Sequence, residues 1–302
     1  MSMFLEPTVQ QYGNNMVMTG VQKPTKKKFV NMDTRFANDY MYPASFHTIE
    51  KYTLTLPERL TDVRSIRVRS VEIPKSFYNF SQSLGNTSFK ATNITSGSYT
   101  TCMIPDGYYA SVGDLLTAMN NNMTAPNLQV TLSDAGNVQF VNNTSAYAYD
   151  LDFAVDASGN SDKYQLRSKL GWALGVRDSS CVVAHGAPTV LDSLYNMNTV
   201  RYLYLVVDEL SSASPHSFMA PVHLSTISKH ILARICLLSP TVYPFGTVLY
   251  GNEPNGVLVT DTRTYTNKID IQKLNVQLVN EWGQPMDMNG LDFSFVLEIE
   301  HE

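Results

Sequence analysis

The sequence predicts an all-β protein: an antiparallel double-sheet jelly roll (β-sandwich) with a small inserted helix-hairpin-helix unit and an extended N-terminal arm. Three observations lead to this class. A long alternating stretch covers Thr53–Pro74, two more cover Lys268–Leu278 and Leu291–Ile299, and short strand-like runs separated by Ser, Pro and Asn lie between them. We therefore expect an arm over residues 1–42 and a jelly-roll domain over 43–302, with an α/β excursion at about 99–175.

The stretch Thr53–Pro74 changes phase partway along. Apolar residues alternate in one phase through Val68 and in the opposite phase from Val71 onward. Because the side-chain period of a regular strand is two, such a change requires an extra residue or a sharp bend. We expect a long bent strand with a β-bulge near Arg69 and Ser70.

The C-terminal stretch alternates without such a break. Leu291, Phe293, Phe295, Leu297 and Ile299 are predicted to face one way, and Phe293, Phe295, Leu297 and Ile299 are predicted to form one buried row. Since strands at the two ends of the chain close a sandwich by pairing, we expect this stretch to lie beside Thr53–Pro74.

The composition limits which size, partner and compartment classes the protein can belong to. The chain has 302 residues, of which 43% are hydrophobic, enough for a sizeable core. Its net charge of −5 disfavours nucleic acid as a partner. The three cysteines are widely spaced and predict neither disulfides nor a zinc site, and no membrane span or signal peptide is indicated. We expect use in a reducing compartment, and we assign the Asn-x-Ser/Thr triplets to polar loops rather than to glycosylation.

The excursion contains the clearest helix signal. Ser111 is the expected N-cap and Asp114 completes a capping-box variant. The elements predicted after this helix are a hairpin of Leu128–Leu132 with Val138–Phe140, a strand at Leu151–Val155, and a short helix over Asp162–Leu170 that closes at Gly171, with Trp172 and Leu174 in the core.

The later strands complete the sandwich. Arg201–Val207 has few polar residues and is expected to be buried on both faces or at a subunit contact. The others are Ile231–Leu237, Gly246–Tyr250 and Val257–Val259. Together these segments predict about eight principal strands.

The N-terminal segment 1–42 combines a basic run with apolar anchors. Lys26, Lys27 and Lys28 precede Phe29, and Phe36 and Tyr40 follow. One interpretation is a solvated tail, since runs of like charge are usually exposed. The other is an arm that becomes ordered only on a neighbouring subunit.

An ordered series of motifs gives the chain a family resemblance. The series runs Asn31–Arg35, Leu56–Pro57, Val63–Pro74, Ile104–Tyr109, Leu170–Trp172, Leu205–Asp208, Glu281–Gly283 and Met288–Gly290. In this order it resembles the minor capsid and penton-type proteins of large icosahedral double-stranded DNA viruses of the nucleocytoplasmic type. The resemblance implies a jelly roll, synthesis in the host cytoplasm, a place in the virion capsid, and contacts with the major capsid protein and other minor capsid proteins. It also implies no enzymatic activity and no cofactor.

The sequence contains no strong signal for a metal or catalytic site. His216, His223 and His230 lack a metal-ligand spacing, and Asp208–Glu209 is interpreted as solvated charge at a strand end. The acidic loop of Asp287, Asn289 and Asp292 fits a polar turn better than a calcium loop. No nucleophile elbow, phosphate-binding loop or dinucleotide fingerprint occurs, so no catalytic, cofactor or metal residue is assigned.

Two function classes remain, a structural capsid protein and a carbohydrate-binding (lectin-like) jelly-roll module. Within the first class we prefer a minor capsid protein that cements the major capsid capsomers, and the alternative is a penton that closes the five-fold vertex as a homopentamer. A position beneath the capsomers would allow contact with an inner membrane, although nothing in the sequence indicates it. Further interaction candidates are aromatic residues near predicted turns, which are Phe77, Tyr78, Phe80, Tyr108 and Tyr109; the alternative is that they only cap the sandwich.

Overall fold

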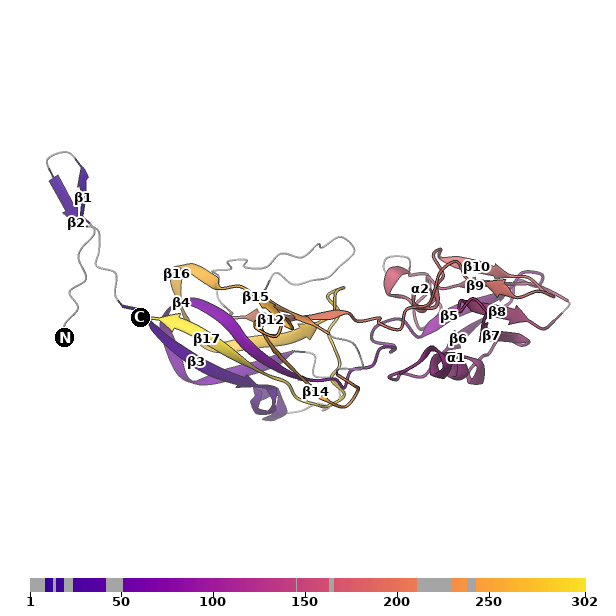
Figure 1. Ribbon diagram of the computed structural model, residues 1–302, viewed down its shortest axis with the longest axis horizontal. Helices are drawn as coiled ribbons and strands as arrows, with labels where there is room; N and C mark the ends of the chain where they lie inside the picture. The colour runs from indigo at the N-terminus through magenta and orange to yellow at the C-terminus, as the bar shows by residue number, and fades with distance from the viewer. Residues whose placement is uncertain are drawn as a thin grey trace.

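The protein consists of two β-rich lobes that lie side by side along its longest axis (Figure 1). The computed structural model describes residues 9–12, 15–18, 24–41, 51–144, 146–162, 166–210, 230–237 and 243–302. Each lobe has a separate cluster of buried apolar side chains. The larger lobe contains both the first long strand and the C-terminal strand, and the smaller lobe is inserted between them.

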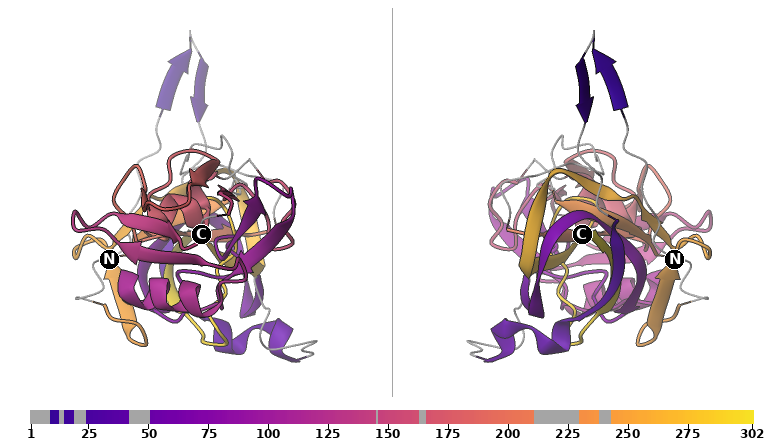
Figure 2. Two further views of the ribbon diagram at one scale, coloured as in Figure 1. Left: turned by 90° about the vertical axis from the view of Figure 1, so that its right-hand side faces the viewer. Right: turned by 90° about the vertical axis from the view of Figure 1, so that its left-hand side faces the viewer.

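The described part of the larger lobe is built on one antiparallel sheet of eight strands. Its strands are β3 (Lys26–Asp33), β4 (Tyr52–Pro74), β12 (Tyr202–Asp208), β13 (Ile231–Cys236), β14 (Val248–Asn252), β15 (Leu258–Thr260), β16 (Arg263–Val279) and β17 (Ser294–His301). They are ordered β15-β13-β12-β16-β4-β17-β3, and β14 also pairs with β4. The strands curve around a shared interior (Figure 2), which is consistent with a β-sandwich.

Strand β4 connects the two parts of this sheet. Residues 52–66 pair with β16, whereas residues 63–72 pair with β17 and residues 70–74 with β14. The predicted pairing of the first long strand with the C-terminal strand is therefore confirmed. The predicted bulge is confirmed as well: Ser70 lies opposite Val296 and Val68 opposite Leu297, which leaves Arg69 as the extra residue.

The bulge keeps apolar side chains on the interior face of β4 on both sides of the phase change. Val68 and Val71 are both buried, although they differ by an odd number of residues. Arg69 projects to the outer face, where its Nε lies 2.6 Å from Glu298 Oε2. The extra residue thus adds a charged contact between β4 and β17.

The predicted buried row on the C-terminal strand is confirmed, since Phe293, Phe295, Leu297 and Ile299 are all buried. The strand itself was predicted to start too early: Leu291, which alternates in phase with the row, is 48% exposed. Strand β17 begins only at Ser294, and Leu291 lies in a turn where its N–H donates to the carbonyl of Met288.

Strand β12 is buried on both faces, as its composition predicted. One face contributes Leu203, Leu205 and Val207 to the main core. The other face places Tyr204 and Val206 in a small separate cluster. Because β12 lies between β13 and β16, both of its edges are hydrogen-bonded.

In its described residues, the smaller lobe contains two sheets, two α-helices and a 3-10 turn. One sheet is formed by β5 (Ser88–Asn93), β6 (Tyr99–Met103), β9 (Tyr149–Asp152) and β10 (Ser180–Val183), in the order β10-β9-β5-β6. The other is formed by β7 (Leu128–Leu132), β8 (Val138–Asn142) and β11 (Thr189–Val190). The helical elements are α1 (Val112–Asn121), η3 (Leu166–Ser168) and α2 (Leu170–Leu174).

The smaller lobe is wider than the excursion expected at 99–175. Its core extends from Phe80 to Leu191. The difference arises because β5 precedes residue 99 and still pairs with both β6 and β9. Strand β5 is short and partly polar, so it lacks the alternation that marks a long strand.

Helix α1 has the predicted start. The Ser111 hydroxyl accepts from the N–H of Asp114, whose carboxylate accepts from the N–H of Ser111, which completes a capping box. The predicted hairpin is also present, since β7 pairs with β8.

The second predicted helix is placed too early. Helix α2 ends at Gly175, whose φ of 114° terminates it, and not at Gly171. Gly171 lies inside the helix and lets the Phe153 ring approach closely, since a Cβ there would come within 2.5 Å of that ring. Trp172 is half-buried and not in the core; the guanidinium carbons of Arg167 and Arg177 lie 5.4 and 4.4 Å from its ring.

The N-terminal segment is part of the larger lobe from Lys26 onward. Strand β3 pairs with β17 along its whole length, from Asp33 opposite Ser294 to Lys26 opposite His301. The expected arm 1–42 is therefore not a separate segment over these residues, because main-chain pairing needs no strong side-chain period. Two 3-10 turns follow, η1 (Thr34–Phe36) and η2 (Asn38–Met41). Farther upstream, β1 (Val9–Tyr12) and β2 (Asn15–Met18) pair as a hairpin that stands apart from both lobes in Figure 1.

Candidate assembly surface

Strand β3 forms one edge of the main sheet. It pairs with β17 on one side, and no described strand pairs with its other side. Phe29 lies on this strand and is 62% exposed. An open strand edge with an exposed aromatic ring is a surface that favours association with another chain.

The three lysines of β3 differ in their partners. Lys27 Nζ donates to Glu298 Oε1 at 2.8 Å, and Lys28 Nζ donates to Glu58. Lys26, at the start of the strand, forms no ion pair within the described residues. Two of the three lysines that were predicted to meet a partner surface are therefore paired within the chain instead. The hydrogen bond from Lys27 lowers the pKa of Glu298, which stays ionised on the outer face.

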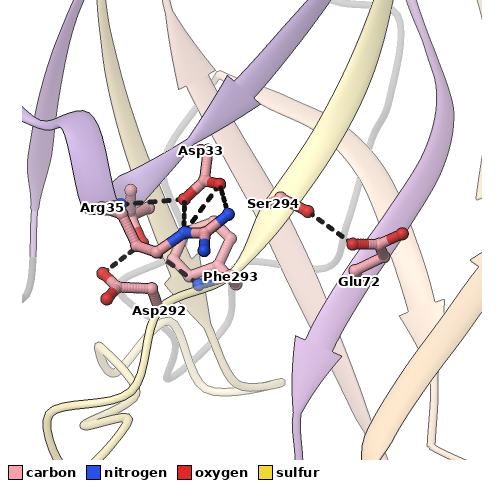
Figure 3. A network of polar contacts seen from close by, with 7 residues as sticks. Asp33, Arg35, Glu72, Asp292, Phe293 and Ser294 are labelled. Carbon is pink, nitrogen blue, oxygen red and sulfur yellow. Dashed lines mark hydrogen bonds and ion pairs between the residues drawn. The ribbon is translucent and has the colours of Figure 1, made fainter.

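The turn η1 is fastened to the start of β17 by a polar network (Figure 3). The Thr34 hydroxyl donates to Asp292 Oδ1 at 2.8 Å and accepts from the N–H of Phe293 at 3.1 Å. The N–H of Thr34 donates in turn to the carbonyl of Phe293 at 3.1 Å. Beside it, the Ser294 hydroxyl donates to Glu72 on β4 at 3.0 Å. These bonds fix the position of η1 relative to the sheet.

Asp33 and Arg35 stabilise the same turn. Asp33 accepts from the backbone N–H of Arg35 at 3.0 Å as the N-cap, and from the Arg35 guanidinium through Nε and Nη2. This side-chain hydrogen bond holds the pKa of Asp33 below its usual value. The Arg35 guanidinium carbon lies 5.8 Å from the ring of Phe36, which is 76% exposed. The turn therefore presents an exposed aromatic ring on a constrained backbone.

The remaining anchor of the N-terminal segment, Tyr40, belongs to η2, and its side chain lies outside the described residues. Phe29 and Phe36 are thus the two sequence-predicted anchors that the structure shows exposed.

The aromatic residues predicted near turns separate into two groups. Phe77 and Phe80 are buried in the main and smaller cores, and Tyr109 packs edge-on against Phe80 with ring centroids 5.8 Å apart. Tyr78 and Tyr108 are half-buried and stack on the ring of Phe245, at 6.4 and 4.5 Å. No sequence pattern indicated a role for Phe245, which lies in a Pro-Phe-Gly loop and is 41% exposed.

The interpretation of Asp208–Glu209 as solvated charge is wrong for Glu209, which is buried. Its Oε1 accepts from Arg263 Nη1 at 2.5 Å and from the Tyr265 hydroxyl. Arg263 also donates to the carbonyls of Val207 and Ile231. Burial raises the pKa of Tyr265, and the adjacent Glu209 carboxylate raises it further, so the phenol stays protonated as the donor.

A ligand-like group of side chains lies beside this network. Ligand atoms of Asp208, Glu209 and His230 lie within 4.8 Å of one another. The Arg263 guanidinium already binds Glu209 and would repel a cation, so the group is better explained as a buried polar network. His216 and His223 lie outside the described residues.

The acidic loop before β17 is a polar turn, as expected. Asp287 Oδ1 accepts from the N–H of Asn289, and Asn289 donates from its side chain to the carbonyl of Ser76. Asp292 is engaged by Thr34. No helix within the described ranges is long and apolar enough to cross a membrane.

No protein-family model matches the chain, and no curated protein matches it in sequence. Among solved structures, the chain is similar to the crystal structure of the mavirus penton protein, with a TM-score of 0.41 and 8% sequence identity. The alignment covers 91% of this chain and 99% of that chain.

Proposed function

We propose that the protein is a structural component of the capsid of a large icosahedral double-stranded DNA virus. In this proposal it occupies a minor capsid position and cements capsomers of the major capsid protein through extended surfaces, without catalysis. The proposal rests first on the order of motifs that resembles this protein class and on the antiparallel β architecture of both lobes.

The observation that supports it best is the exposed edge formed by β3 and η1. Phe29 and Phe36 project from backbone that is fixed by main-chain pairing and by the network around Thr34. Aromatic side chains on preordered backbone are typical anchors of protein interfaces, because little conformational entropy is lost when they bind. A protein whose task is association would gain from such anchors.

The experiment replaces both anchors and measures incorporation. Phe29→Ser with Phe36→Ser should leave the melting temperature near that of the parent, since both rings are exposed, and should lower the amount of protein in assembled particles several-fold. Tyr99→Ser is the matched control, because Tyr99 is 65% exposed on the smaller lobe. Full incorporation of the double variant would remove this edge from the assembly interface.

The mass of the purified protein in solution distinguishes the penton alternative from the minor capsid proposal. A penton would be a homopentamer in which each subunit joins two different flanks to its neighbours. Multi-angle light scattering of the purified protein distinguishes a stable pentamer from a monomer that associates only with other shell proteins. A pentamer would favour the vertex position over the minor capsid position.

A further inference from the structure

Lys75 is the one buried basic side chain in the described ranges that has no carboxylate partner. Three basic residues there are buried, which are Lys75, Lys169 and Arg263. Lys169 pairs with Asp162, and Arg263 pairs with Glu209. Lys75 is 9% exposed, and its ammonium forms neither an ion pair nor a hydrogen bond with any described group.

The position of Lys75 follows from the strand before it. Lys75 directly follows β4, and its backbone N–H and carbonyl are bonded to Thr247 and Gly246. The side chain is thereby directed into the region where the chain passes between the two lobes. Its Nζ lies 5.8 Å from the centre of the Tyr108 ring, which is stacked on Phe245 at 4.5 Å.

This region contains a cavity of about 260 Å³. Its walls include Lys75, Phe77, Asn79, Tyr108, Thr199 and Arg201. Asn79 is fixed by hydrogen bonds in both directions with the backbone of Tyr109, and its carbonyl accepts from the Thr199 hydroxyl at 2.6 Å. The cavity is therefore lined by side chains held in place by both lobes.

The ammonium of Lys75 lies in the wall of this cavity without a carboxylate partner, which is energetically unfavourable for a charged group. The Lys75 ammonium keeps some contact with water through the cavity, but its surroundings are partly desolvated and supply no counter-charge. This partial desolvation lowers the pKa of Lys75. A ligand that brings a negative charge to this ammonium would relieve the penalty, whereas a neutral ligand would not.

We propose that the cavity between the lobes binds the carboxylate of an acidic monosaccharide unit, with Lys75 as its ionic partner and the Tyr108 ring as a flat wall. The volume is below the ~300–1,000 Å³ of drug-sized sites, so it suits one ring rather than an oligomer. The lining combines a cation without a carboxylate partner, an aromatic face and the side-chain amides of Asn196 and Asn198, which suits a ring with several hydroxyl groups and one carboxylate. A sugar-binding site goes beyond the proposed capsid role, because assembly of a shell does not require one.

The test is calorimetric titration of the full-length protein with glucuronate, with glucose and with N-acetylglutamate. Glucuronate should bind and glucose should not, because only the former carries the carboxylate. N-acetylglutamate should bind more weakly than glucuronate, because it lacks the ring that would lie against Tyr108. Equal binding of glucuronate and N-acetylglutamate would overturn the assignment to a sugar, and the absence of glucuronate binding would overturn the site.

Substitution identifies the residue responsible. Lys75→Met should reduce glucuronate affinity roughly tenfold or more, as expected for a lost hydrogen bond to a charged group. The variant should fold, since it replaces an unpaired buried charge by an apolar chain of similar length. Lys273→Met removes one exposed positive charge elsewhere and should leave binding unchanged. Unchanged affinity in Lys75→Met would overturn the proposal, and so would an equal loss in Lys273→Met.

Discussion

Phe295 gives the most direct test of how the larger lobe is held together. Its ring is 1% exposed and stacks against Phe293 at 6.4 Å, and its backbone lies between Met32 on β3 and Val71 on β4. Phe295→Ala deletes the ring from a site enclosed by three strands. Such deletions cost about 3–5 kcal/mol, because the lost transfer energy is joined by the energy of the cavity.

The loss should appear as a lower melting temperature of the larger lobe. At about 2–4 °C per kcal/mol for a domain of this size, the midpoint should fall by about 6–20 °C. Val296→Ala is the matched control, because Val296 is the next residue on the same strand and is only half-buried on the opposite face. It should cost less than about 1 kcal/mol. A Phe295→Ala midpoint within a degree of the parent, or no larger a shift than for Val296→Ala, would refute the assignment of this row to the core.

Three further predictions concern charge and backbone. The hydrogen bond from Lys27 lowers the pKa of Glu298, so the stability that this bond contributes should be present above the ordinary glutamate pKa and lost as the pH falls further. Glu298→Gln should reduce this acid dependence of stability in unfolding titrations. An unchanged profile would contradict the pairing. Glu209→Gln should lower the free energy of unfolding by about 3–5 kcal/mol, because it leaves Arg263 without its counter-charge. In a double-mutant cycle, adding Arg263→Met should restore part of that loss. Additive losses would contradict the coupling of the two residues. Gly175→Ala should prevent normal folding of the smaller lobe, since a Cβ there would lie 2.1 Å from a backbone oxygen, and a parent-like midpoint would show that α2 ends elsewhere.

The larger lobe was predictable where alternation was strong. The phase change before Val71 identified the bulge at Arg69, and the apolar row from Phe293 identified the C-terminal core strand. Both signals depend on the side-chain period of two, which a buried face enforces. Where a face is not buried, as at Leu291, the same alternation continued past the end of the strand.

Features held by backbone pairing or by tertiary contacts were not predictable. Strand β3 shows little alternation because its edge needs only main-chain hydrogen bonds to β17. The burial of Glu209 depends on Arg263, which lies more than 50 residues away in the sequence. Lys75 gave no signal either, since the residues that surround it lie far apart in the sequence and come together only in the folded chain.

The candidate surface was predictable in its residue types and only partly in its geometry. Phe29 and Phe36 are exposed, as an interaction role requires. Lys27 and Lys28, in contrast, are paired with Glu298 and Glu58 within the chain. The sequence could not show this: Glu298 is brought beside Lys27 by the pairing of β17 with β3, and Glu58 lies on β4, which does not pair with β3.

Cross-linking mass spectrometry of purified virus particles tests the central proposal most directly. Lys26 lies on the open edge of β3 without an ion pair, so an amine-reactive cross-linker should join it to the major capsid protein or another shell protein. Lys90, whose ammonium lies 4.5 Å from the Tyr99 ring on the smaller lobe, is the internal comparison and should form fewer such cross-links. Absence of the protein from purified particles, or intermolecular cross-links from Lys90 but none from Lys26, would contradict a capsid role through this edge.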